Sequence, residues 1–277
     1  MRRLALLALA ASCLARRPEP YDESAACRPH CGSDQRLHVI SFTTPHFANI
    51  TALFYRSLHA VADRDRRLTE YVFHAKHSPM RGRSGSGLFG DGVYSGAMFE
   101  RAIFLRDLAK RLPDGELCVF LDADVVALRP LSELVAAAGA LADAGANATT
   151  FTFMRNAWYG PTSNKPHAAN LGAYVWRHSA AARRHFEWMH NAVVVGGQWN
   201  DQYLLPKVMA RDWPAASLRA AHFAPETAAF SPNDVCQRTV VYHAIGVKGE
   251  LAKLDRLERA SARRNARCVG VDWGGLG

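Results

Sequence analysis

The sequence predicts an α/β fold in which a mostly parallel sheet is flanked by helices, within a single domain from about residue 37 to 277. Apolar runs typical of strands alternate with segments of helical periodicity along most of the chain, an order that favours a parallel sheet. The 277 residues are 49% hydrophobic and 21% charged, which provides enough apolar side chains for a sizeable core.

A leader precedes this domain. Met1-Arg2-Arg3, the apolar stretch from Leu4 to Ala15 and Arg16-Arg17 have the layout of a secretory signal, so we expect residues 1–17 to be a signal peptide. A helix that spans a membrane needs about 20 apolar residues, and the stretch from Leu4 to Ala15 is shorter than that. A short signal-anchor, which would give membrane association through the N-terminus, and an apolar leader without a targeting role are the alternatives. Residues 18–36 are expected to form a linker or stem.

The sequons and cysteines fit a glycoprotein in the lumen of the Golgi or endoplasmic reticulum, or a secreted one. The sequons are Asn49-Ile50-Thr51 and Asn147-Ala148-Thr149. Cys27 and Cys31 flank a turn and could form a disulfide in an oxidising lumen, whereas an isolated C-x3-C pair does not match a zinc site. Cys118 lies inside an apolar strand and is expected to be a buried small hydrophobe.

The formal net charge of +9 suits anionic partners and phosphate-containing ligands. Lys and Arg are spread along the chain, and the sequence holds no DNA- or RNA-reading motif, so we expect no nucleic acid as a partner. Residues 248–264 predict a basic amphipathic helix. We interpret its charges as a solvated face, with membrane binding as the alternative.

The first half of the domain is predicted to run strand, helix, strand. Residues 38–44 form a predicted strand and residues 47–63 a helix, before a second strand at 71–75. The apolar side chains on one face of this helix are Phe54, Leu58 and Val61. A Gly- and Ser-rich loop from 77 to 96 follows. Its segment Gly85-Ser86-Gly87-Leu88-Phe89-Gly90 matches a dinucleotide-binding fingerprint by letter only, because no strand or helix adjoins it.

The helix predicted over residues 97–112 carries a charge on its apolar face. Its apolar stripe consists of Met98, Ala102, Leu105, Leu108, Ala109 and Leu112. Arg101 falls inside that stripe, and a guanidinium that faces the core must find an anion. The expected partner is a carboxylate of the strand that follows or a substrate phosphate. A snorkelling or purely structural, ion-paired arginine is the alternative.

Asp122-Ala123-Asp124 ends the apolar run of residues 117–121. Two carboxylates at the end of a buried strand are costly to desolvate unless a cation offsets their charge, and a hard divalent metal that also holds a phosphate does this. Ligands of parallel sheets bind outside the carboxyl ends of the strands, where this pair lies. The pattern therefore indicates a metal-dependent enzyme that acts on a nucleotide-activated substrate.

The second half of the domain continues the alternation. Ser132 is predicted to cap an Ala-rich helix that ends near Gly145. The remaining predicted elements are strands at 149–154 and 168–176, a helix at 179–190, and a short β run at 238–243 before the basic helix.

Four segments follow one another along the chain: Leu121-Asp122-Ala123-Asp124-Val125-Val126, Asn170-Leu171-Gly172-Ala173-Tyr174-Val175-Trp176-Arg177, Asn200-Asp201-Gln202, and Val240-Val241-Tyr242-His243 with Gly246 and Lys248. In this order they resemble the D-x-D motif, the N-x-G strand, the D-Q element and the late His-x-x-G segment of GT-A-type nucleotide-diphospho-sugar transferases. The resemblance covers roughly residues 37 to 260. The resemblance implies a GT-A-like, Rossmann-like mixed sheet flanked by helices.

The resemblance also implies a metal site and a donor site. In the family, the D-x-D carboxylates and a late His hold Mn or Mg, which bridges the phosphates of a nucleotide sugar such as a UDP-sugar. Asp122, Asp124 and His243 would be the metal ligands here, and Asp122 would also belong to the donor site. Lys248 would reach a phosphate oxygen, although it equally opens the basic helix. For His243, a core histidine without a ligand is the alternative.

Further contacts are implied with the nucleoside and the sugar. Thr43 and Thr44, at the end of the first strand, would contact the base and ribose. Gly172 would let the backbone approach the ligand, or serves packing. Asn170 and Asp201 are candidate catalytic residues that contact sugar hydroxyls, although Asp201 also suits the start of a helix. Arg101 is the third candidate catalytic residue.

These observations predict a glycosyltransferase, either a hexosyl- or a pentosyltransferase, that acts on a glycan, protein or lipid hydroxyl. The resemblance favours retention of the anomeric configuration. A haloacid-dehalogenase-like phosphatase with Asp122 as its nucleophile is an alternative, but it would need an early motif and a late acidic pair, and the chain has neither. A nucleotide-sugar- or carbohydrate-binding protein without catalysis is another.

Overall fold

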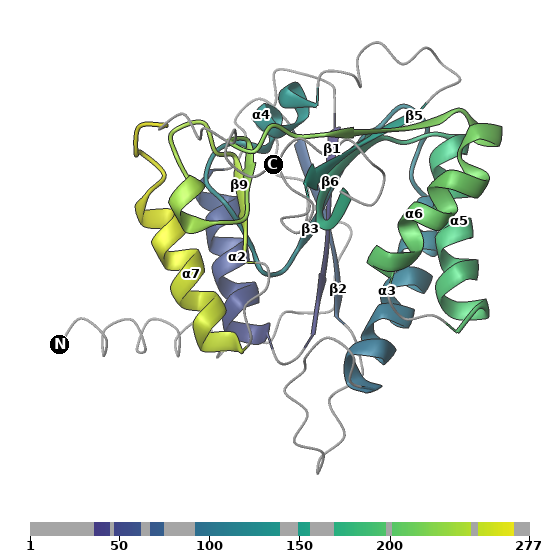
Figure 1. Ribbon diagram of the computed structural model, residues 1–277, viewed down its shortest axis with the longest axis horizontal. Helices are drawn as coiled ribbons and strands as arrows, with labels where there is room; N and C mark the ends of the chain where they lie inside the picture. Colours follow the sequence, from purple (N-terminus) through teal and green to yellow (C-terminus); the bar gives the residue numbers. More distant parts are fainter. Residues whose placement is uncertain are drawn as a thin grey trace, which may run out of the picture.

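The computed structural model describes residues 36–44, 47–61, 67–74, 92–138, 149–155, 169–197, 201–244 and 249–268 (Figure 1). The predictions that lie outside the described residues concern the leader at 1–17, the linker at 18–35, a bridge between Cys27 and Cys31, the Gly-rich segment at 85–90, the sequon asparagine Asn147, and Lys248.

The central sheet has six strands in the order β2-β1-β3-β6-β5-β7. The strands are β1 (Arg36–Thr43), β2 (Arg67–His74), β3 (Leu117–Asp122), β5 (Thr149–Arg155), β6 (Ala169–Arg177) and β7 (Leu218–His222). β1 pairs in parallel with β2 and β3, and β5 pairs in parallel with β7, whereas β6 is antiparallel to both β3 and β5. The predicted α/β class with a mostly parallel sheet is therefore confirmed, and β6 is its reversed strand.

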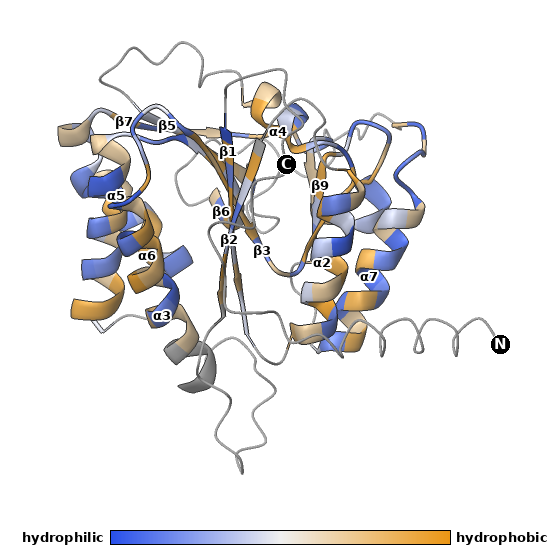
Figure 2. Ribbon diagram, turned by 180° about the vertical axis from the view of Figure 1, so that it is seen from behind, coloured by the Kyte–Doolittle hydropathy of each residue, from blue (hydrophilic) through white to orange (hydrophobic). Residues whose placement is uncertain are grey.

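Helices cover both faces of this sheet. α2 (Ala48–Ala60) and α4 (Leu131–Ala137) pack on one face, and α7 (Glu250–Ala262) packs beside α2 (Figure 1). α3 (Gly92–Ala109), α5 (Ala180–His190) and α6 (Asp201–Asp212) cover the other face, with the π-helical turn η5 (Asn191–Val195) after α5. Figure 2 shows hydrophilic and hydrophobic residues on each of these helices, as amphipathic helices at the surface of a core require.

Alternate residues of β3 face opposite layers of the core, and this alternation aims Asp122. Cys118 and Phe120 belong to the core on the side of α3, α5 and α6. Val119 and Leu121 belong to the core on the side of α2 and α4. Because side chains alternate along a strand, Asp122 continues the first series and points toward α3.

A second sheet of three short strands carries the late histidine. Its order is β4-β9-β8, with β4 at Val125–Ala127, β8 at Ala228–Ala229 and β9 at Val241–His243. β9 is antiparallel to β4, and His243 lies opposite Val125. Since β4 begins directly after Asp124, this pairing brings His243 beside the acidic pair. Two 3-10 turns follow in this part of the chain. η6 (Pro214–Ala216) precedes β7, and η7 (Pro232–Asp234) lies between β8 and β9.

Some predicted boundaries differ from those of the structure. α4 begins at Leu131 with Pro130 as its N-cap residue and no side-chain cap, so the prediction that Ser132 caps this helix is wrong. The fixed φ of proline sets where the chain enters the helix. The second strand begins at Arg67, ahead of the predicted start at residue 71. β4, β7 and β8 were not predicted, and α6 was anticipated only as the alternative interpretation of Asp201, because short or polar segments give weak periodic signals.

A disulfide joins Cys236, which follows η7, to Cys268, which follows α7. The spacing of the cysteines alone did not indicate this pairing. Cys118 is free and buried, as predicted. In the part of the chain that the structure describes, no helix combines the length and apolar character that a bilayer span requires.

Candidate active site

Two carboxylates share one buried arginine at the end of β3. Arg101 of α3 donates from Nη1 to Asp122 Oδ1 at 3.1 Å, and its Nη2 pairs with Asp201 Oδ2. The Arg101 side chain is 7% exposed, and its guanidinium lies 5.6 Å from the centre of the Phe120 ring. Arg101 therefore does not snorkel. Its planar donors hold two carboxylates from elements far apart in the sequence.

Asp124 is bound by two other groups. His243 Nε2 of β9 lies 3.0 Å from Asp124 Oδ1, and Lys253 Nζ of α7 pairs with Asp124 Oδ2. The Asp124 side chain is only 14% exposed. The two partners follow Asp124 by 119 and 129 residues. This carboxylate is thus enclosed by the C-terminal part of the chain.

Gly172 of β6 lies under the imidazole ring of His243. A Cβ at this position would overlap Cε1 and Nδ1 of His243 and would lie 2.9 Å from Asn170 Oδ1. Within the described residues, the buried Nδ1 of His243 has no hydrogen-bond partner, so packing holds this side of the ring. Residue 172 must therefore be a glycine because the His243 ring lies against the backbone of β6 there. A contact between Gly172 and a ligand stays a prediction.

Asp122, Asp124 and His243 fit a divalent metal ion. One ligand atom from each residue lies within 4.8 Å of the other two. His243 Nε2 is 3.0 Å from Asp124 Oδ1 and 3.9 Å from Asp122 Oδ2. Metal–ligand bonds of about 2.1 Å place neighbouring ligands about 3 Å apart, so small side-chain movements would complete the site. Two carboxylates suit Mn²⁺ or Mg²⁺, and an imidazole is a common further ligand.

The two carboxylates of the pair differ in their electrostatic surroundings. Burial raises the pKa of Asp122, and the nearby Arg101 only partly opposes this effect. Burial also acts to raise the pKa of Asp124, but Lys253 and His243 outweigh it and hold that pKa well below its ordinary value. Asp124 is therefore ionised at neutral pH. The negative charge of Asp122 is less compensated than that of Asp124, so an added cation would stabilise ionised Asp122 more than ionised Asp124.

Gln202 attaches the start of α6 to β6. Its Oε1 accepts from the Leu171 N–H at 3.1 Å, and its Nε2 donates to the Ala169 carbonyl. Asp201 Oδ1 accepts from the Gln202 N–H at 2.8 Å, while its Oδ2 faces Arg101. Asp201 thus begins a helix and also belongs to the arginine-centred cluster. The bonds from Gln202 support β6 where its register against β5 shifts.

Other predicted contact residues bond within the protein. Asn170 Oδ1 accepts from the Gly172 N–H at 2.8 Å. Thr43 is buried, and its hydroxyl lies 2.5 Å from that of Thr51 on α2. Thr44, directly after β1, is partly exposed and is the more accessible of the two threonines. The contacts of these residues with a nucleoside or a sugar stay predictions.

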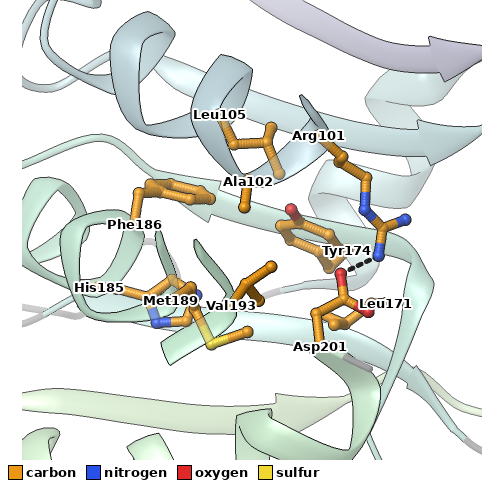
Figure 3. A pocket seen from close by; sticks show the side chains of 10 residues that line it. All are labelled: Arg101, Ala102, Leu105, Leu171, Tyr174, His185, Phe186, Met189, Val193 and Asp201. Atoms are coloured by element: carbon orange, nitrogen blue, oxygen red, sulfur yellow. Dashed lines mark hydrogen bonds and ion pairs between the residues drawn. The ribbon is translucent and has the colours of Figure 1, made fainter. Parts of the chain in front are cut away.

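A small cavity adjoins the arginine-centred cluster (Figure 3). It has a volume of about 30 Å³, which is room for one or two water molecules. Figure 3 shows Arg101 and Asp201 facing each other at one end of the cavity and His185, Phe186 and Met189 at the other. The remaining lining side chains are Ala102, Leu105, Leu171, Tyr174 and Val193.

The structure brings most of the predicted site residues together. Those that lie in one cluster are Arg101, Asp122, Asp124, Gly172, Asp201 and His243. Lys253 was not predicted, because its helix has a solvated basic face and no local pattern marks this lysine. Gln202 was not named as a site residue either, and the D-Q resemblance was the signal that pointed to it.

No family model matches this sequence, and no curated protein matches it. Solved structures that align with most of the chain include a glycosyltransferase involved in glycosylation of the major capsid of PBCV-1. It is 12% identical, with a TM-score of 0.47, and the match covers 82% of this chain and 99% of that one.

The galactosyltransferase LgtC, solved with donor and acceptor sugar analogues, is 13% identical with a TM-score of 0.48, and the match covers 86% of this chain and 99% of that chain. The apo glycosyltransferase GlyE of Streptococcus pneumoniae is 10% identical with a TM-score of 0.49, and the match covers 87% of this chain and 62% of that chain. All three TM-scores lie below 0.5.

Proposed function

We propose that this protein is a glycosyltransferase that moves a sugar from a nucleoside-diphosphate sugar to a hydroxyl group of a glycan, protein or lipid. The observation that carries the proposal is the convergence of Asp122, Asp124 and His243 within 4.8 Å at the carboxyl end of β3. A divalent ion at these residues, Mn²⁺ or Mg²⁺, would neutralise the diphosphate leaving group as the glycosidic bond breaks.

The residues around the metal ligands would position the substrates. Arg101 holds Asp122 and Asp201 at a fixed separation, which keeps a second carboxylate beside the site of transfer. We assign Asp201 and Asn170 to hydroxyl groups of the sugar, Thr43 and Thr44 to the nucleoside, and Lys248 to a phosphate. Retention of the anomeric configuration, and the choice between a hexosyl and a pentosyl donor, are part of the proposal.

We propose that the protein works in the lumen of the secretory pathway. The disulfide between Cys236 and Cys268 supports this location, because disulfides persist in oxidising compartments. The leader at 1–17 has the layout of a secretory signal. A C-terminal fluorescent fusion of the full chain would accumulate in the endoplasmic reticulum or Golgi, and a cytosolic signal would contradict this location.

Release of nucleoside diphosphate from a panel of nucleotide sugars, with Mn²⁺ present, tests the function. We expect Asp124→Asn to lower this release by more than about 100-fold, because the variant loses a charged metal ligand. Asp255→Asn is the matched control, since Asp255 is an exposed acid on α7 whose ion pair is with Arg259. Circular dichroism should show the same fold for both variants.

The outcomes separate the proposal from its alternatives. Wild-type turnover by Asp124→Asn would remove the metal assignment. Release of inorganic phosphate from a phosphomonoester, lost in Asp122→Asn, would indicate a phosphatase instead. Binding of nucleotide sugars without turnover, in the presence of any acceptor extract, would indicate a binding protein.

A further inference from the structure

Lys253 pairs with one of the candidate metal ligands. Its Nζ pairs with Asp124 Oδ2, the oxygen of that carboxylate that does not face His243. The Lys253 side chain is 16% exposed, and its Nζ lies 5.5 Å from the centre of the Phe47 ring. An aliphatic chain and an ammonium group are therefore held in place beside the candidate ligands, not free in solvent.

Several contacts fix the helix that carries Lys253. Leu257 and Ala260 of α7 are buried in the core that α7 shares with α2 and the small sheet. At its start, Glu250 Oε1 accepts from the Asn49 N–H of α2 at 3.3 Å. Lys253 lies near the electropositive N-terminus of α7, where a further positive charge is unfavourable. Its pairing with Asp124 offsets that cost.

The charges of the cluster are nearly balanced without a metal ion. Arg101 neutralises one unit of the charge on Asp122 and Asp201, and Lys253 neutralises Asp124. A divalent ion at Asp124 would lie within a few ångströms of the Lys253 ammonium, and like charges at such distances repel strongly. A divalent ion that binds without a diphosphate therefore meets an Asp124 carboxylate that is already paired with Lys253.

We propose that Lys253 is an internal cation that keeps the affinity of this site for divalent ions low until a diphosphate binds. A diphosphate brings several anionic oxygens, so Lys253, with its three donors, can transfer its hydrogen bond from Asp124 to a phosphate oxygen. Metal and donor would then bind together rather than in sequence. This inference rests on the proposed function, and it adds to it the order in which the ligands are held.

Manganese binding to Lys253→Gln tests the inference. The substitution removes the charge and keeps most of the length of the side chain. With Mn²⁺ as the only ligand, we expect Lys253→Gln to bind it about tenfold more tightly than the wild type, because one nearby positive charge is lost. Addition of UDP should tighten Mn²⁺ binding strongly in the wild type and less in the variant. Electron paramagnetic resonance of free Mn²⁺ and calorimetry measure both effects.

Two further variants control for charge and folding. Arg259→Gln removes an exposed positive charge from the same helix, where Arg259 pairs with Asp255, and it should keep wild-type Mn²⁺ affinity. Lys253→Arg keeps the charge and should remain close to the wild type. A purely structural lysine would give the opposite sign, since its loss would loosen the site and weaken the binding of Mn²⁺.

Each remaining result overturns a defined part of the proposal. Unchanged or weaker Mn²⁺ binding by Lys253→Gln, with normal binding of Mn²⁺ and UDP by the wild type, overturns the role of Lys253 and leaves the metal site intact. Absence of Mn²⁺ binding by every variant, with and without UDP, overturns both the role of Lys253 and the metal assignment.

Discussion

At the scale of single residues, Gly172 shows how one absent side chain sets the geometry of the candidate metal site. The imidazole of His243 lies where the Cβ of any other residue would project from β6. His243 Nδ1 has no hydrogen-bond partner in the described part of the chain, so the orientation of the ring depends on this packing. The ring in turn presents Nε2 to the two carboxylates.

Gly172→Ala should therefore displace His243. We expect the free energy of unfolding to fall by about 1–3 kcal/mol, the usual cost of overpacking a core, and Mn²⁺ affinity to fall with it. Urea denaturation and Mn²⁺ titration measure the two effects. His243→Ala removes the overlap with the ring and leaves only the 2.9 Å contact with Asn170 Oδ1, so Gly172→Ala should cost much less stability in that background. An equal cost in both backgrounds would show that His243 is not the group that requires the glycine.

At the scale of elements, two short C-terminal segments complete the site. β9 places His243 beside Asp124 by pairing with β4, and α7 places Lys253 on the same carboxylate. The disulfide between Cys236 and Cys268 spans α7 and joins the two ends of the segment that contains it. A covalent link at this point limits how far α7 can separate from β9.

Replacement of both bridged cysteines by serine should destabilise the fold. The two cysteines are 32 residues apart, and closing a loop of this size contributes about 3.7 kcal/mol in the chain-entropy account. Denaturant titration of the oxidised wild type and of the double variant measures the loss. Dithiothreitol should destabilise the wild type and leave the double variant unchanged. A wild type that is indifferent to the reductant would contradict the structural role of the bridge.

At the scale of the whole molecule, histidines in the fold make its stability depend on pH. Burial lowers the pKa of His185 to about 3, and burial with a nearby arginine lowers the pKa of His178 and of His222 to about 4. Each is neutral in the folded protein, whereas the unfolded chain takes up a proton below about pH 6.5. Their stabilising contribution is therefore complete above that pH and is lost as the pH falls toward the folded pKa.

The free energy of unfolding should decrease as the pH falls from about 6.5 to about 4, by up to about 1.4 kcal/mol per pH unit for each histidine. His185→Gln retains an acceptor for the Trp213 Nε1 donor and should make this decrease shallower. His59→Gln is the control, because the hydrogen bond that His59 Nε2 donates to Glu70 raises the pKa of His59, and its effect has the opposite sign. Urea titrations across this range decide the matter. A slope that His185→Gln leaves unaltered would contradict the assignment.

The pattern of residues within single elements was enough to predict some residues of the site. Asp122 and Asp124 stood out because they end an apolar run, and Arg101 stood out because it interrupts an apolar stripe. The structure confirms that this arginine meets a carboxylate of the next strand. The same reasoning did not predict that Asp201 is its second partner, since that contact joins residues 100 positions apart.

The sequence by itself determined the alternation of strands and helices, and with it the placement of an acidic pair at the carboxyl end of a buried strand. Only the tertiary structure decided which side chains meet Asp124, namely His243 and Lys253. The physical reason is range. Periodicity reports which face of an element is buried, whereas pairing across more than a hundred residues depends on how sheets and helices pack against one another.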